Sequence, residues 1–134
     1  MKFEKRNINP KGNSAQDCVI RAIATATSQS WYEVFDGLCK IARDECYMIG
    51  DTKVLKEYLK EHKHKTCPAI KGQKRKKVKD FNNGTYVLRV SSHLTCVVEG
   101  VHIDNWDCKE KCVYRYWEIK GGGGNGNIYS KEQA

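Results

Sequence analysis

The sequence lacks any long apolar run, and no stretch approaches the roughly 18 consecutive apolar residues that a membrane-spanning helix requires. Its first residues, MKFEKR, are charged, and no apolar segment of the kind found in secretory signals follows them. Internal repeats are absent as well. We therefore expect a cytoplasmic protein that has no membrane partner.

A regular cysteine framework is also missing, although the chain has seven cysteines. Their number is odd, their spacing is irregular, and a reducing cytosol disfavours disulfides. Under these conditions a cysteine serves more often as a packed thiol, a metal ligand or a nucleophile. Each cysteine therefore has to be judged by its own surroundings.

What the chain does contain suits one globular domain of 134 residues, with 40% apolar and 30% charged residues. Much of the net charge of +8 is concentrated in one short basic segment, residues 71–79. Its basic residues are Lys71, Lys74, Arg75, Lys76, Lys77 and Lys79. Such a run attracts polyanions through counterion release, but it is more often a solvated loop. Nucleic acid is therefore kept only as a lower-ranked partner.

The first half of the chain carries three segments with helical periodicity, after a turn-rich stretch at 1–17. The first helix is expected to begin at Asp17 or Cys18 and is apolar on most sides. Residues 30–33 have the Ser-x-x-Glu pattern of a capping box before the second helix. The third helix is expected to begin at 51–52.

The second half of the chain has the period of β-strands. Strands are expected at 85–90, 93–99, 101–104 and 113–119. Glu99-Gly100 is expected as a tight turn between the second and third of them. This order of elements predicts an α+β fold, in which N-terminal helices pack on a C-terminal antiparallel β-sheet. Four glycines at 121–124 favour a flexible tail, so we place the domain at 1–120 and the tail at 121–134.

Cys18 is the cysteine whose position favours a nucleophile, because unpaired N–H groups and the helix dipole stabilise a thiolate at a helix N-terminus. A histidine is well suited to take the thiol proton near neutral pH. His93 opens an apolar strand after two serines. Of the others, His62 and His64 lie at a lysine-rich helix end, and His102 lies within a strand. The alternative is that Cys18 is a small buried apolar residue and His93 an ordinary side chain.

Asp104 is expected to orient the imidazole of His93. His93 starts one strand, the turn at Glu99-Gly100 reverses the chain, and Asp104 ends the next strand. Because a hairpin brings its two outer ends together, Asp104 should lie beside His93. A carboxylate there can hold the second imidazole nitrogen, although strand ends are also a common place for aspartate.

Three segments together resemble the papain-like cysteine peptidase superfamily, in particular its short members from Gram-positive bacteria and their phages. They are DCVIRA at 17–22, SHLTCVV at 92–98 and DNWD at 104–107. The resemblance implies a papain-like fold and a cysteine peptidase, with Cys18 as nucleophile, His93 as base and Asp104 as the orienting residue. Trp106, two positions after Asp104, is then expected to shield the His–Asp hydrogen bond from water. This spacing favours Asp104 over the neighbouring Asn105, which is assigned a supporting role.

The oxyanion donor is the point at which the chain departs from the family pattern. A glutamine usually stands about six residues before the nucleophile, where this chain has Gly12. Gln16 and Asn13 are nearby, so they are assigned as side-chain donors beside the backbone N–H of Cys18. The implied enzyme is a thiol hydrolase without metal or cofactor that acts on a protein or peptide. Peptide hydrolysis, isopeptide hydrolysis and acyl transfer all stay open.

Three alternatives are kept. The pattern Asp-Cys-x-x-Arg-Ala is also similar to the nucleophile segment of the ovarian-tumour-type deubiquitinases. That family does not explain the Asp104-x-Trp106 spacing. A zinc site is the second alternative, and its candidate ligands are Cys108, Cys112, His62, His64 and Cys67. The third is a basic binding module for nucleic acid or an acidic protein on an inactive papain-like fold.

Overall fold

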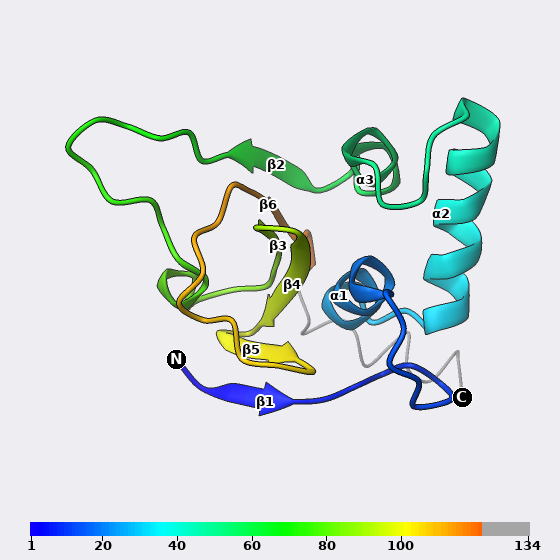
Figure 1. Ribbon diagram of the computed structural model, residues 1–134, viewed down its shortest axis with the longest axis horizontal. Coiled ribbons are helices and arrows are strands. Elements are labelled where there is room, and N and C mark those ends of the chain that lie inside the picture. Colours follow the sequence, from blue (N-terminus) through cyan, green and yellow to red (C-terminus); the bar gives the residue numbers. More distant parts are fainter. Residues whose placement is uncertain (122–134) are drawn as a thin grey trace.

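Three α-helices and a six-stranded mixed sheet make up the α+β fold of residues 1–121, the part of the chain that the computed structural model describes (Figure 1). The helices are α1 (Cys18–Thr27), α2 (Trp31–Glu45) and α3 (Thr52–Tyr58). The strands are β1 (Phe3–Lys5), β2 (Lys63–Thr66), β3 (Tyr86–Val90), β4 (His93–Val98), β5 (Val101–Asp104) and β6 (Arg115–Glu118). A short 3₁₀ turn, η1 (Val78–Asp80), lies at the end of the basic segment.

Two expectations from the sequence, the lack of a membrane-spanning helix and the glycine-rich tail, can be compared with the structure only over residues 1–121. No helix among residues 1–121 is both long and apolar enough to cross a bilayer. The glycine-rich tail expected at 121–134 falls, apart from Gly121, on residues outside the described part.

The helices begin where the sequence predicts them. The capping box is present, because Ser30 Oγ accepts from the backbone N–H of Glu33 and the Glu33 carboxylate accepts from that of Ser30, both at 3.0 Å. Asp51 caps α3 by accepting from the backbone N–H of Lys53 at 2.9 Å. α1 starts at Cys18, so this thiol is carried by a helical turn whose N–H groups lack intrahelical partners.

The sheet has the strand order β1-β5-β4-β3-β6-β2, and its neighbours are antiparallel except for β1 and β5. The prediction of a wholly antiparallel sheet is therefore wrong at this edge, and the turn-rich stretch 1–17 contains a strand. β1 has only three residues, two of them charged, so it carries no strand period in the sequence. Main-chain bonds flank it: His102 N donates to Lys2 O at 2.9 Å, and Arg6 N donates to Asp104 O at 2.8 Å.

β2 is a second strand that the sequence does not predict. The expectation that His62 and His64 lie at a lysine-rich helix end is wrong for His64, whose strand pairs with β6 and whose ring lies 4.9 Å from that of Trp117. His62 lies just before the strand, where its Nδ1 accepts from the backbone N–H of Lys120 at 2.8 Å. The lysine-rich sequence of β2 is typical of an edge strand protected against pairing with another chain. It lacks the alternation of apolar and polar residues by which a strand is predicted.

The hairpin of β4 and β5 has the tight turn that the sequence predicts. Glu99 and Gly100 both have positive φ, at 49° and 79°, which two-residue hairpin turns require. A Cβ on Gly100 would approach the backbone oxygen of Asn82 to 2.7 Å, so this position needs glycine. Cys96 lies opposite Ile103, and this register brings the start of β4 and the end of β5 to the same end of the sheet.

α1 lies between the sheet and α2 and packs against both (Figure 1). The main core joins the helices to one side of the sheet and includes Ile23, Leu38, Leu55, Val87, Leu94 and Trp117. A second cluster contains Val78, Phe81, Leu88, Val90, Val97 and Val113. Burial of the main core holds the N-terminus of α1 at the start of β4.

Candidate active site

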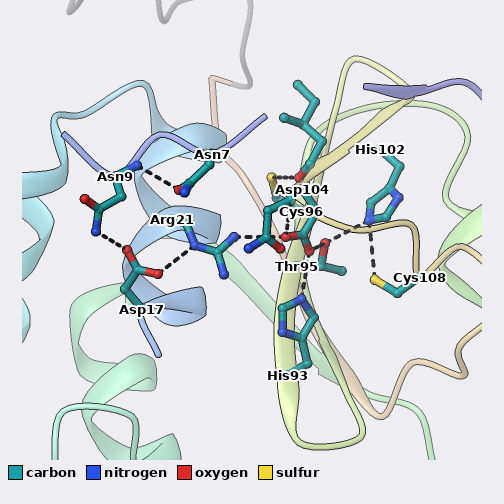
Figure 2. Close-up of polar contacts among 12 residues, drawn as sticks. Asn7, Asn9, Asp17, Arg21, His93, Thr95, Cys96, His102, Asp104 and Cys108 are labelled. Carbon is teal, nitrogen blue, oxygen red and sulfur yellow. Dashed lines mark hydrogen bonds and ion pairs between the residues drawn. The ribbon is translucent and has the colours of Figure 1, made fainter. Parts of the chain in front are cut away.

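His93 and Asp104 meet at the open end of the β4–β5 hairpin, where they are the first residue of β4 and the last residue of β5. His93 Nε2 donates to Asp104 Oδ2 across 2.7 Å (Figure 2). Both residues are buried, with 8% and 5% of their surface exposed. Because Nε2 is committed to Asp104, Nδ1 is the nitrogen left for Cys18.

Cys18 meets the imidazole from the first turn of α1. Its half-buried sulfur lies near the His93 imidazole and the backbone N–H of Leu94, and both can hydrogen-bond to it. Burial raises the pKa of the Cys18 thiol, but these hydrogen bonds and the positive charges of His93 and Arg21 bring the pKa below its ordinary value. The site therefore favours a thiolate at residue 18.

The ionisation of His93 and Asp104 complements that of the thiol. Burial lowers the pKa of His93, but hydrogen bonds with Asp104, Cys108 and Cys18 raise it to about 11. Burial also raises the pKa of Asp104, but hydrogen bonds from His93 and Thr95 lower it below its ordinary value. These shifts favour a thiolate–imidazolium pair beside an ionised carboxylate.

The Asp104 carboxylate has four hydrogen-bond donors. Oδ2 accepts from His93 and from the Thr95 hydroxyl, the latter at 2.6 Å. Oδ1 accepts from Arg21 Nη1 at 3.0 Å and from the backbone N–H of Asn105 at 2.7 Å. A buried carboxylate satisfied on both oxygens has little freedom to turn, so it holds the His93 ring in one orientation.

Arg21 is a site residue that the sequence analysis does not identify. Its Nε donates to Asp17 Oδ1 at 2.8 Å, while its other arm binds Asp104 (Figure 2). Asp17 Oδ2 in turn accepts from Asn9 Nδ2 and Trp31 Nε1, both at 2.9 Å. The four-residue spacing of Asp17 and Arg21 was a signal for a helical ion pair. The bond to Asp104, which lies 83 residues along the chain, left no signal in the sequence.

Trp106 and Asn105 both lie against the His–Asp pair. The Trp106 ring is 5.0 Å from the His93 ring and 42% of the residue is exposed, so the indole covers one side of the imidazole. Asn105 contributes its backbone N–H to Asp104, as described above. Its side-chain oxygen is buried and has no hydrogen-bond partner within residues 1–121.

Gln16 and Asn13, the predicted oxyanion donors, both lie in the exposed stretch before α1. Gln16 is in a bend two residues before Cys18. Asn13 is held through its backbone, because its N–H donates to Asn9 Oδ1 at 3.2 Å and its carbonyl accepts from Asn7 Nδ2 at 3.1 Å. Their assignment to an oxyanion hole stays a prediction.

The five candidate ligands of the zinc alternative do not form one cluster among the residues described. Cys108 is buried beside His102, with 3.4 Å between Sγ and Nε2. Cys112 bridges to Lys77 through the backbone, and His64 lies on Trp117. The group that does bring metal-binding atoms together consists of His93, Asp104 and Cys108.

The basic segment 71–79 is a partly neutralised loop. The Arg75 guanidinium lies 4.5 Å from the centre of the Tyr114 ring. Lys77 and Lys79 both pair with Glu110, at 3.4 and 3.0 Å. These contacts occupy part of the positive charge on which the binding-module alternative depends.

Comparisons with known proteins add no family to this geometry. The chain matches no protein-family model, no curated protein sequence and no solved structure. The arrangement of Cys18, His93 and Asp104 is therefore the basis on which function is argued.

Proposed function

We propose that the protein is a papain-like, thiol-dependent acyl hydrolase in which Cys18, His93 and Asp104 act as the catalytic triad. The observation that carries this proposal is the placement of the Cys18 sulfur beside His93, whose Nε2 donates to the buried Asp104 carboxylate. The lowered pKa of the thiol and the raised pKa of the imidazole support the same assignment.

The first half of the reaction forms a thioester. The Cys18 thiolate attacks the carbonyl carbon of the substrate, and the C=O π electrons move to oxygen. The backbone N–H of Cys18, with Gln16 or Asn13, stabilises this oxyanion. His93 then gives its Nδ1 proton to the leaving amine as the C–N bond breaks, and the acyl group stays on sulfur.

The second half regenerates the thiolate. The now neutral His93 takes a proton from water through Nδ1, and the resulting hydroxide attacks the thioester carbonyl. The C–S bond breaks, the carboxylic acid leaves, and the imidazolium again faces a thiolate. Asp104 keeps its bond to Nε2 in both halves, so Nδ1 stays aimed at the reacting atoms.

The substrate that fits this chemistry is a protein or peptide amide. An isopeptide bond presents the same carbonyl and the same amine leaving group, so it satisfies the same mechanism. An amine in place of water would complete an acyl transfer by the same steps.

Competitive alkylation tests the proposal directly. Limiting iodoacetamide near neutral pH, with mass spectrometry of every cysteine, should label Cys18 first because the thiolate is the reactive form. Cys46 is the matched control, since it is exposed whereas Cys18 is half-buried. Labelling of Cys46 ahead of Cys18 would mean that exposure alone sets the rate, and the proposal would fail.

Covalent labelling by an activity-based probe is the second arm of the test. An acyl probe that reacts with activated thiols should modify the wild-type protein and not Cys18→Ala. His93→Gln should lose the same reaction while it keeps the Cys18 sulfur. Equal probe labelling of wild type and His93→Gln would show that the thiol does not depend on the imidazole.

A further inference from the structure

Cys108 is a buried thiol that the proposed mechanism does not use. Only 2% of its surface is exposed, and it follows β5 by four residues. The fully buried Cys96 belongs to the apolar main core, whereas Cys108 lies among polar groups. Its sulfur is 3.4 Å from His102 Nε2. Thiolate sulfur and imidazole nitrogen are the ligand atoms that zinc prefers, so a buried thiol beside an imidazole is a candidate metal ligand.

Three donor atoms converge at this point. A ring nitrogen of His93, a carboxylate oxygen of Asp104 and Cys108 Sγ all lie within 4.8 Å of one another, and all three residues are buried. Ligand atoms around a tetrahedral zinc ion are about 3.5 Å apart, so small side-chain rotations suffice to close the set. Thiolate and imidazole together favour zinc over magnesium or calcium.

His102 lies outside this group of three but is a candidate fourth donor, because its Nε2 is 3.4 Å from Cys108 Sγ. Its ring is fully buried, and its Nδ1 has no hydrogen-bond partner within residues 1–121. The Thr95 hydroxyl donates to Asp104, so it accepts its 2.9 Å bond from a proton on His102 Nε2. Nδ1 is then a buried, unsatisfied lone pair, an arrangement that costs free energy.

A metal ion removes this cost. With the proton moved to Nδ1, the Nε2 lone pair is free for a metal, and Asp107 Oδ1, now 3.9 Å from Nδ1, can accept that proton once the half-exposed Asp107 side chain moves closer by roughly 1 Å. Metal-bound histidines commonly donate their second nitrogen to a carboxylate in this way. The unsatisfied Nδ1 faces Asp107, whereas Nε2 faces Cys108, so a metal ion held by Nε2 would leave both nitrogens of the buried ring with a partner.

We propose that these four residues bind one zinc ion and that the bound ion switches the thiol site off. The second clause rests on the proposed function. Zinc on His93 Nε2 replaces the hydrogen bond to Asp104 and leaves the ring with one proton, on Nδ1. The ring cannot give that proton to a leaving group without becoming an imidazolate, so acyl transfer stops. Cys18 is not a ligand in this proposal.

Cobalt(II) titration of the metal-free full-length protein tests the binding clause without any activity assay. One equivalent should bind with a thiolate-to-cobalt charge-transfer band, zinc should displace it, and magnesium should not. Cys108→Ser should abolish the band, and His102→Gln should weaken cobalt binding at least about tenfold. Cys112→Ser is the matched control, since it removes a thiol four residues away and should keep the band.

The results that overturn the site are equally specific. A band that survives in Cys108→Ser, or disappears in Cys18→Ser, would place the metal elsewhere. Because Cys108 is buried and its variant risks misfolding, His93→Gln is titrated in parallel, and zinc should raise the Tm of wild type but not of this variant. A stable, folded His93→Gln that binds cobalt as tightly as wild type would end the proposal.

The two proposals fail separately. If Cys18 of the metal-free protein is unreactive but the cobalt band appears, the hydrolase fails and the metal site stands. If Cys18 is reactive and no band appears, only the metal site fails. If both hold, zinc at one equivalent should suppress turnover, and the chelator EDTA should restore it.

Discussion

Replacing Arg21 by glutamine removes the guanidinium that bridges two buried carboxylates, those of Asp17 and Asp104. The two bonds are 2.8 and 3.0 Å long, and only 9% of the Arg21 side chain is exposed. Removing one partner of a buried ion pair costs about 3–5 kcal/mol, because a charge is left without compensation. Both carboxylates keep other donors, so we expect the lower end of this range, about 3 kcal/mol.

This loss is large for a domain of this size, whose free energy of unfolding is on the order of 5–15 kcal/mol. It should lower the Tm by about 10 °C and shift the urea midpoint without changing the slope. Arg43→Gln is the matched control, because its side chain is 77% exposed and its ion pair with Asp44 is at the surface. That variant should unfold at the wild-type midpoint.

Circular dichroism during thermal and urea unfolding measures both variants. Arg21→Gln should also slow the alkylation of Cys18, because the same bridge orients Asp104 and contributes positive charge to the thiolate. An Arg21→Gln protein within about 1 kcal/mol of wild type would refute the reasoning, since it would mean that the two carboxylates do not depend on this guanidinium.

Two further predictions concern the ionisation of the triad. Asp104→Asn should lower the pKa of His93 and reduce kcat by about 10²–10⁴-fold, measured with any substrate that wild type turns over; an unchanged kcat would remove Asp104 from the triad. In Cys18→Ala, where the bonds to Asp104 and Cys108 still raise the pKa of His93, stability should fall as pH rises above 6.5, because the folded state holds a proton there that the unfolded state has lost. In wild type the lowered pKa of the Cys18 thiol adds an effect of opposite sign, because the folded state has lost a thiol proton that the unfolded state keeps up to pH 9.0. Stability should therefore fall less steeply as pH rises toward 9.0 than it does in Cys18→Ala. Urea unfolding at several pH values measures both proteins, and equal slopes would argue against the thiolate–imidazolium pair.

The parts of this fold that were predictable are those coded locally. The capping box at Ser30 and Glu33 is complete within four residues, and both of its bonds form. The Glu99-Gly100 turn sets the hairpin register, so the proximity of His93 and Asp104 followed from 12 consecutive residues. Short-range patterns of this kind need no knowledge of the rest of the chain.

The parts that were not predictable depend on distant partners. β1 pairs with a strand about a hundred residues away, and its Phe-Glu-Lys sequence carries no period of its own. Cys108 and Cys112 were grouped by their spacing, yet the fold turns Cys108 toward His102. Arg21 was visible as one half of a helical ion pair, but its second carboxylate was supplied by the sheet.

The parallel pairing of β1 with β5 connects the first six residues to the strand that ends at Asp104. The main-chain N–H of Arg6 donates to the carbonyl of Asp104, the residue whose carboxylate holds His93. A peptide bound at that sheet edge, or an affinity tag that displaces β1, would disturb this main-chain bond and, through Asp104, the orientation of the His93 ring. On the proposed function, the amino-terminal segment is therefore one of the supports that fix the backbone position of Asp104.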